Sequence, residues 1–166
     1  MCKNILPHFK KRNTGKIIQI SGGGATSPLP FISAYALSKA AIVRFVENLS
    51  NEIKKYNIQI NAVAPGPLNT DMLKEILKAG PKKVGKAFYN KSLIQNEEGG
   101  TDFEKVCDLI LFLASKHSNE ISGKIISAVW DNWKNWINNK NDLKNSDVYT
   151  LRRIVGKDRG FEWGDN

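Results

Sequence analysis

The chain has 166 residues, of which 41% are hydrophobic and 25% charged, and its formal net charge is +9. These proportions are typical of a globular chain with a hydrophobic core and exclude a disordered, collagenous or coiled-coil protein. The apolar runs are much shorter than the ~20 residues that cross a bilayer. The first residues also lack the apolar stretch of a signal peptide. We therefore expect a cytoplasmic protein that does not enter a membrane.

The positive charge is spread along the chain. Basic pairs or triplets occur at Lys10–Arg12, Lys54–Lys55, Lys82–Lys83 and Arg152–Arg153, and no aromatic residues alternate with them as a nucleic-acid-binding surface would require. We expect a solvated surface without nucleic-acid binding, with attraction to an anionic ligand or to nucleic acid as the alternative. Two cysteines and two histidines, scattered in the sequence, predict neither a disulfide nor a metal site.

Strand and helix patterns alternate from the start of the chain. The β-branched run Lys16–Ile20 predicts a buried strand, and the glycine- and proline-rich segment Ser21–Pro30 predicts a loop. A long helix over Ala34–Tyr56 follows, with Ser33 as its N-cap and Asn57 as its left-handed end. The residues expected on its apolar stripe are Ile42, Phe45, Val46, Leu49 and Ile53.

The middle of the chain continues this alternation. Ile58–Ala64 predicts a second strand and Asp71–Ala79 a short helix, whereas Gly80–Gly100 is expected to be an irregular, polar connection. Thr101 and Glu104 form a capping-box pattern.

That box predicts a helix to about Ser115, with Cys107 near the core. A third strand is expected at Lys124–Val129. Strands that alternate with helices predict an α/β fold with a mainly parallel sheet.

The composition changes after Val129. Three of the four tryptophans, Trp130, Trp133 and Trp136, lie close together and suggest, with Ile137, one face of a helical turn or two. Clustered tryptophans more often pack than bind a cofactor. We therefore interpret 130–166 as a C-terminal appendage that packs on the body, residues 1–129, or on a partner.

Three glycines follow the first predicted strand, but they do not form a phosphate-binding fingerprint. That pattern needs a further glycine at position 27, which is Ser27, and a helix that starts directly after the turn. Ligands nevertheless bind at the carboxyl ends of parallel strands. The loop is therefore expected to lie near a site without cradling a phosphate.

Tyr35 and Lys39 are four residues apart at the start of the long helix, so they lie on one face. A cation about 5 Å from a phenol favours phenolate by roughly 3 kcal/mol at an effective dielectric of ~20. The tyrosine pKa is thereby lowered toward the range useful for acid–base catalysis. Because lysine is abundant in this chain, the pair alone is weak evidence.

Its context is more specific, because Gly15–Met72 resembles the short-chain dehydrogenase/reductase family. The matching parts, in order, are the strand GKIIQIS, a glycine-rich loop, SAYALSKAA with the Tyr-x-x-x-Lys motif, and IQINAVAPGPLNTDM with its Pro-Gly motif. Thr101–Val129 resembles the family more loosely. The resemblance implies a partial Rossmann-like parallel sheet of three strands with flanking helices, the C-terminal half of a complete member.

The resemblance also implies an NAD(P)-dependent oxidoreductase that interconverts an alcohol and a ketone. Tyr35 would be the general acid/base, and Lys39 would lower its pKa and bind the nicotinamide ribose. The nicotinamide end would be lined by Pro65, Gly66, Leu68 and Thr70. The polar segment 90–102 and the unusual tail suggest a polar small-molecule substrate, such as an activated sugar.

Two departures from the family pattern matter. Gly22 stands where the family has a serine that bonds the substrate oxygen, and Ser21 could replace it if the backbone turns at the glycines. The other donors in reach in principle are Thr26, Ser27 and Ser33. The chain also contains no counterpart of the pyrophosphate-binding first half. The alternative is a truncated or split, non-catalytic fragment that acts only as an interaction partner.

A half-fold would expose one edge of its first strand and the helix faces that pack on the other half. Exposed strand edges pair with other chains, and exposed apolar patches mark interfaces. We therefore expect a homo-oligomer or a complex with a complementary N-terminal half.

Overall fold

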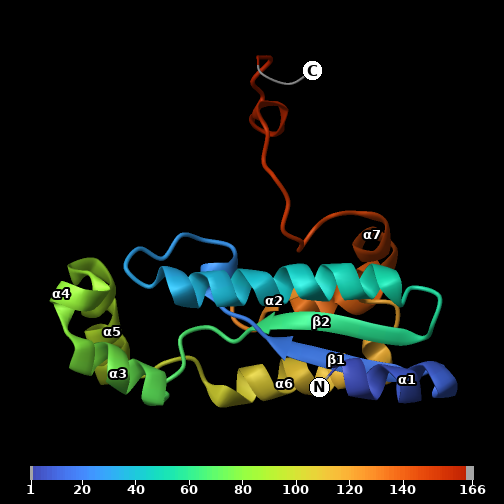
Figure 1. Cartoon of the computed structure of the whole chain (residues 1–166), viewed down its shortest axis with the longest axis horizontal. Helices are drawn as coiled ribbons and strands as arrows, with labels where there is room; N and C mark the ends of the chain where they lie inside the picture. Colours follow the sequence, from blue (N-terminus) through green and yellow to red (C-terminus); the bar gives the residue numbers. More distant parts are fainter. Residues whose placement is uncertain (1, 164–166) are drawn as a thin grey trace.

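The computed structural model describes residues 2–163 as three parallel strands between two layers of helices (Figure 1). Strands β1 (Gly15–Ile20), β2 (Ile58–Ala64) and β3 (Ile125–Ser127) are hydrogen-bonded in that order. The predicted α/β fold is confirmed. β3 is shorter than expected because the chain turns after Ser127, whose N–H donates to a carboxylate oxygen of Asp131 at 2.7 Å.

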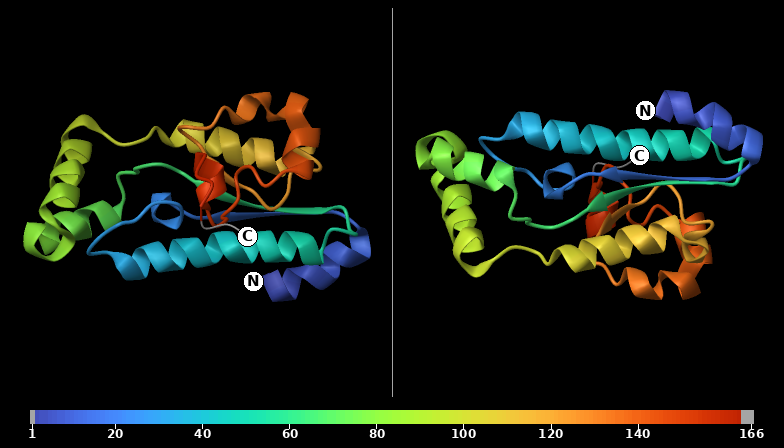
Figure 2. Two further views of the ribbon diagram at one scale, coloured as in Figure 1. Left: turned by 90° about the horizontal axis from the view of Figure 1, so that it is seen from above. Right: turned by 90° about the horizontal axis from the view of Figure 1, so that it is seen from below.

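The two helical layers lie on opposite faces of the sheet (Figure 2). Helices α1 (Cys2–Arg12) and α2 (Ser33–Glu52) cover one face. Helix α6 (Phe103–Ala114) and the tryptophan-containing segment cover the other. Within residues 2–163, none of the helices combines the length and apolarity needed to cross a membrane.

Central strand β2 joins two hydrophobic clusters, one under each helical layer. Every residue of β2 is buried, as expected for a strand covered on both faces. Its polar Asn61 is satisfied there, because its side-chain amide donates to the Ile121 carbonyl at 2.8 Å and accepts from the Lys124 N–H at 3.1 Å. Asn61 thereby ties β2 to the segment that leads into β3.

Helix α2 differs from its prediction at both ends. Ser33 is its first residue and does not cap it; the capping position is Ile32, which has no side-chain cap bond. The helix stops at Glu52, before Asn57, whose N–H donates to the side-chain oxygen of Asn13 at 3.0 Å. Its buried apolar face consists of Val43, Val46, Leu49 and Ile53, which leaves Phe45 44% exposed.

The segment predicted to be irregular is helical. Helices α3 (Asp71–Ala79), α4 (Pro81–Val84) and α5 (Lys86–Glu98) form a group at one end of the molecule (Figure 1). Gly80, Gly85 and Gly99 separate or end these helices, each with a positive φ that suits glycine. The prediction was wrong because α5 is polar and lacks a strong apolar stripe, the signal on which sequence patterns depend.

Helix α6 is capped by a different residue from the one expected. Asp102, rather than Thr101, accepts the N–H of Glu104 at 2.9 Å. The buried face of the helix is built from Val106, Leu109 and Leu113, and Cys107 is exposed, contrary to the prediction.

Two of the clustered tryptophans complete the second core cluster. Trp133 and Trp136, in the 3-10 helix Trp133–Asn139, are 7% and 4% exposed and pack with Leu143 of α7 (Lys140–Asn145). Trp130 and Ile137 do not share this face, being 71% and 43% exposed.

The contrast between two tryptophans gives a stability test. Trp136→Ala should lower the free energy of unfolding by about 3–5 kcal/mol, because it opens a cavity in a core. Trp130→Ala, which changes the same residue type on the surface, should change it by less than about 0.5 kcal/mol. Urea unfolding followed by circular dichroism measures both. Equal losses would contradict the packing described for Trp136.

Candidate active site

The candidate site lies where the carboxyl ends of β1 and β2 meet the first turn of α2. Because α2 connects two parallel neighbours, it runs back along the sheet, and its first residues lie at the ends of the strands. Between β1 and α2 the glycine loop forms a short 3-10 helix, Gly23–Ala25. In an open α/β sheet this is the edge at which ligands bind.

The side chains of Tyr35 and Lys39 lie over Gly22. A Cβ built on Gly22 would lie 2.8 Å from the Tyr35 hydroxyl oxygen and 3.8 Å from Cγ of Lys39. The backbone at Gly22 is extended, with φ 178° and ψ 171°, so a residue with a side chain could adopt it. The Tyr35 hydroxyl therefore packs directly against the backbone of Gly22, closer than a side chain at this position would allow.

Lys39 links the end of β1 to the ring of Tyr35. Its Nζ donates to the carbonyl oxygen of Ile20 at 3.3 Å and lies 5.5 Å from the centroid of the Tyr35 ring. At that distance a cation is attracted to the face of an aromatic ring. The helical spacing of the pair thus produces the expected contact.

The acidity of Tyr35 differs from the expectation. Burial raises the pKa of Tyr35 above its ordinary value, because a phenolate loses more solvation than a phenol when water is removed. The direction is upward although the ammonium group of Lys39 lies 5.5 Å from the centroid of the ring.

Ser21 is placed next to Lys39, but its hydroxyl is engaged in the fold. The side chain is 2% exposed, and its hydroxyl donates to the backbone carbonyl of Lys39 at 3.0 Å. Its N–H donates to the carbonyl of Val63 in β2 at 2.8 Å. Ser21 therefore anchors the turn of α2 that carries Lys39.

The loop after β2 is tightly packed at Gly66. Gly66 has φ +83°, and a Cβ there would lie 2.5 Å from the Thr101 hydroxyl and 2.7 Å from Cγ2 of Val129. The N–H of Thr101 also donates to the carbonyl of Pro67 at 2.6 Å. The glycine is thus required by both its backbone angle and its neighbours.

The other residues expected at the nicotinamide end have different surroundings. Pro65 is half-buried, and Leu68 packs against the second core cluster. Thr70 is exposed at the N-cap of α3, where its hydroxyl makes no cap bond.

A link between the loop and α5 escaped sequence reasoning. The Gln95 amide donates to the side-chain oxygen of Asn69 at 3.1 Å, and the Asn69 amide donates to the Gln95 carbonyl at 3.4 Å. No sequence signal pointed to this pair, because the segment containing Gln95 was expected to be irregular.

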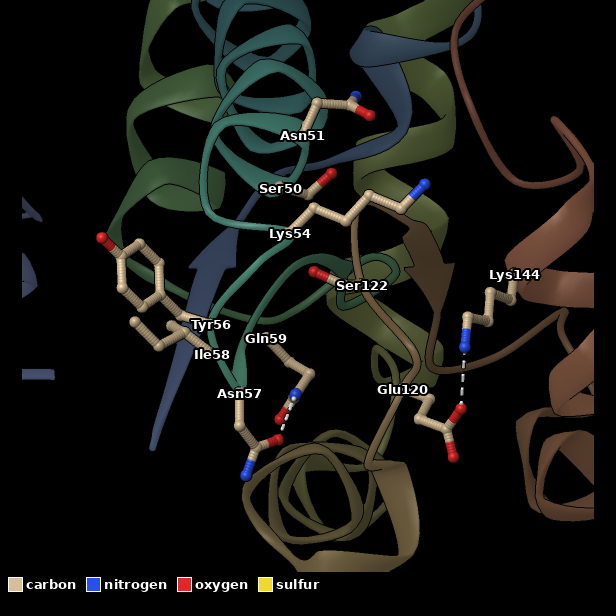
Figure 3. Close-up of a pocket in the computed structure, with 10 residues that line it drawn as sticks. All are labelled: Ser50, Asn51, Lys54, Tyr56, Asn57, Ile58, Gln59, Glu120, Ser122 and Lys144. Atoms are coloured by element: carbon tan, nitrogen blue, oxygen red, sulfur yellow. Dashed lines mark hydrogen bonds and ion pairs between the residues drawn. The ribbon is translucent and has the colours of Figure 1, made fainter. Parts of the chain in front are cut away.

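A polar pocket of about 260 Å³ lies at the other end of the strands, near the start of β2 (Figure 3). It is lined by the end of α2 and the start of β2, with Lys54, Gln59 and Ser122 among its residues. A salt bridge of 3.1 Å joins Lys144 to Glu120 at its rim. The pocket is therefore separate from the site at Tyr35, which lies at the other end of α2.

Comparison with known proteins identifies the family to which the chain belongs. A family model described as enoyl-(acyl carrier protein) reductase matches residues 1–128. Dehydrogenase/reductase SDR family member 4 of Sus scrofa is 29% identical over 126 residues, which are 76% of this chain and 43% of the relative. The 3-oxoacyl-(acyl-carrier-protein) reductase FabG of Chlamydia muridarum is 32% identical over 128 residues, covering 77% of this chain and 49% of the relative.

A solved structure gives the same result. ElxO with NADP bound is 27% identical, with a TM-score of 0.59 over 76% of this chain and 50% of that chain. The chain spans about half the length of the relatives it matches. With the family model covering the sheet, the glycine loop and the Tyr35–Lys39 helix, the chain belongs to the short-chain dehydrogenase/reductase family of oxidoreductases.

Proposed function

We propose that the chain supplies the nicotinamide- and substrate-binding half of an NAD(P)-dependent oxidoreductase that interconverts an alcohol and a ketone. The observation that carries the proposal is the position of Tyr35 and Lys39 over Gly22, at the carboxyl ends of the strands. There a hydroxyl that can exchange a proton stands beside a cation that is bonded to the end of β1.

The residues present fit the nicotinamide end of a dinucleotide. Lys39 has donors beyond the one it gives to Ile20, and the Thr70 hydroxyl is exposed without a cap bond. Lys39 would hold the ribose hydroxyls and Thr70 the carboxamide, with Pro65, Gly66 and Leu68 shaping the loop between them. NADP in the related ElxO structure supports this choice of cofactor class.

Among the described residues, the glycine loop does not form a comparable site for the adenosine and pyrophosphate end of the dinucleotide. A pyrophosphate is best held by a glycine turn that leads directly into a helix N-terminus. Here the glycine turn leads into a three-residue 3-10 helix, and α2 begins only at Ser33. We propose that a complementary N-terminal half provides this part and pairs with β1, which forms an edge of the sheet.

In the proposed mechanism Tyr35 gives a proton to the carbonyl oxygen of the substrate during reduction, or takes one from the alcohol during oxidation. The bound nicotinamide supplies or accepts the hydride. Lys39 orients the phenol through its ring contact, and Ser21 positions Lys39 through the bond to its carbonyl. We assign Ser21 this positioning role in place of direct contact with the substrate.

The substrate is proposed only as a small carbonyl or alcohol compound. Residues 90–102, which were expected to form a polar loop suited to an activated sugar, lie mostly in helix α5. The alternative of a non-catalytic interaction fragment is favoured by Gly22, which removes a hydrogen-bond donor for the substrate oxygen. Cofactor binding distinguishes the two functions.

The acidity of Tyr35 can be measured directly. The difference in phenolate absorbance between the wild type and Tyr35→Phe should give a midpoint above pH 10, because burial raises this pKa. Lys39→Met should leave the midpoint nearly unchanged, since Lys39 contacts the ring face. A midpoint below pH 10 that rises in Lys39→Met would instead show that Lys39 lowers the pKa of Tyr35 in this chain.

Cofactor binding tests the proposed function. Titration of the chain with NADPH and NADH, followed by nicotinamide fluorescence, should show saturable binding. Lys39→Ala should weaken it by about tenfold or more, as expected when a charge-assisted hydrogen bond is lost. Lys54→Ala is the matched control, because Lys54 lines the pocket at the other end of α2, away from Tyr35 and Lys39.

Two results would contradict the proposal. Absence of binding up to millimolar cofactor would support the non-catalytic fragment. An equal loss in Lys39→Ala and Lys54→Ala would show general attraction of an anion to a basic protein, without a nicotinamide site.

A further inference from the structure

The end of the chain forms an arm, residues 152–163, that leaves the body beside β3. Figure 1 shows it extending away from the sheet and the helices. Before the arm begins, the chain passes the side of β3 that faces away from β2. There the N–H of Ile125 donates to the carbonyl of Tyr149 at 2.9 Å. The arm therefore starts at the edge of the sheet opposite β1.

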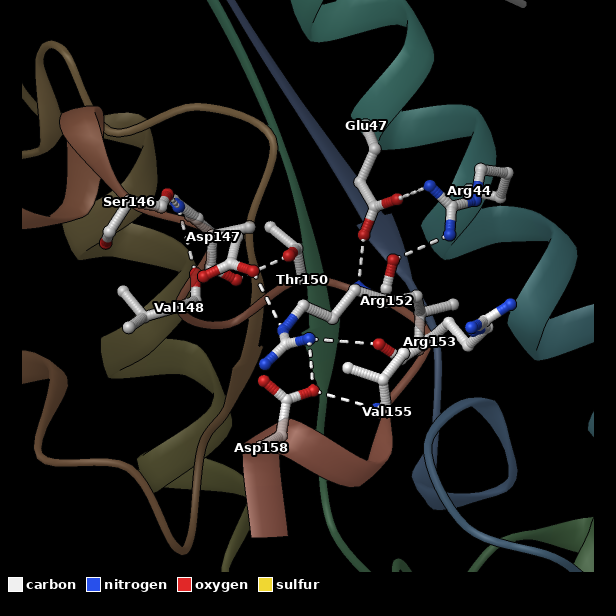
Figure 4. Close-up of polar contacts among 12 residues, drawn as sticks. Arg44, Glu47, Ser146, Asp147, Val148, Thr150, Arg152, Arg153, Val155 and Asp158 are labelled. Carbon is white, nitrogen blue, oxygen red and sulfur yellow. Dashed lines mark hydrogen bonds and ion pairs between the residues drawn. The ribbon is translucent and has the colours of Figure 1, made fainter. Parts of the chain in front are cut away.

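The base of the arm is clamped to α2 (Figure 4). The N–H of Leu151 donates to a carboxylate oxygen of Glu47, and its carbonyl accepts from the guanidinium of Arg44, both at 2.6 Å. Arg44 and Glu47 also form a salt bridge of 2.6 Å, and Glu47 is buried. Both backbone groups of Leu151 are thus held by one ion pair.

The arm has its own internal structure. Arg152 pairs with Asp147 at 2.9 Å and with Asp158 at 2.8 Å, and Asp158 also accepts the N–H of Val155 at 2.9 Å (Figure 4). These contacts hold the turn of the 3-10 helix Gly156–Arg159. An element ordered before association loses less conformational entropy when it binds.

The arm presents apolar and basic side chains to solvent. Ile154, Phe161 and Trp163 are 58%, 53% and 74% exposed, and the rings of Phe161 and Trp163 lie 5.8 Å apart. Arg153 and Arg159 are also exposed, and the acidic residues of the arm are Asp158, which pairs with Arg152, and Glu162. Aromatic residues and arginine are the types that contribute most to binding energy at protein interfaces.

A surface of opposite charge lies on α6. Phe103, Cys107 and Leu111 recur every four residues, so they form one stripe; Phe103 and Leu111 are 54% and 66% exposed. The acidic residues of α6 and its N-cap are Asp102, Glu104 and Asp108, with Lys105 as the single basic residue among positions 102–111. We call this surface, the exposed residues among 102–111, the acidic-apolar face.

Within one chain the arm and this face are on different sides of the molecule. Figure 1 shows α6 at the bottom of the view and the arm rising from the top, pointing away from it. A second copy can bring them together, since each copy offers one arm and one face. Such an interface is heterologous, with different surfaces contributed by the two copies.

We propose that the chain self-associates by docking the arm of one copy on the acidic-apolar face of a second copy. Arg153 and Arg159 pair with the carboxylates of Glu104 and Asp108, and Phe161 and Trp163 cover Phe103 and Leu111. Apolar contact and charge complementarity then act together, as at specific interfaces. This proposal does not depend on the proposed enzymatic function.

The test uses charge reversal of the full chain on both surfaces. Sedimentation equilibrium of the wild type should show association that weakens as salt is raised, because the charged groups are exposed. The arm variant Arg153→Glu/Arg159→Glu and the face variant Glu104→Lys/Asp108→Lys should each self-associate at least tenfold more weakly. Their mixture should recover association, because an acidic arm then meets a basic face.

Two controls separate this interface from general effects. Lys82→Glu/Lys83→Glu, which reverses exposed charges on α4, should associate as the wild type does, and circular dichroism should show that all variants fold. Phe161→Ala/Trp163→Ala should weaken association without changing net charge. A monomeric wild type would overturn the proposal, and so would a mixture that associates no better than its components. Association unchanged in every variant would also overturn it and would point to the edge of β1.

Discussion

The burial of β2 is the constraint on which the rest of the structure depends. Ile58, Ile60 and Ala62 face the cluster under α2, while Val63 belongs to the cluster under α6. A strand buried on both faces needs partners on both edges and all its polar groups satisfied. β1 and β3 supply the edges, and the side chain of Asn61 satisfies backbone groups beside β3.

The candidate site follows from where these strands end. Ser21 joins the two elements that carry it, since its N–H binds β2 and its hydroxyl binds α2 at Lys39. Lys39 in turn binds the last carbonyl of β1 and faces the ring of Tyr35. The position of the phenol is thus tied to the central strand through a short chain of contacts, although burial of that phenol works against its ionisation.

The two edge strands of the sheet, β1 and β3, have different surroundings. The β3 edge is partly covered by the segment that leads to the arm, and Lys124 adds bonds from its ammonium group to the carbonyls of Ser146 and Val148. β1 is the other edge of the three-stranded sheet, and the relatives of this chain are about twice its length. This β1 edge is the one that the complementary half is proposed to cover.

By itself, the sequence determined the strands β1 and β2, the helix α3 and the pairing of Tyr35 with Lys39, because short apolar runs and helical spacing are local signals. It did not reveal α5, whose weak apolar pattern carries little information, or the cap at Asp102, which a nearby threonine imitates. Only the tertiary structure decided which tryptophans are buried, what Ser21 binds and how acidic Tyr35 is. These properties depend on neighbours that are distant in the sequence and on the water that packing removes.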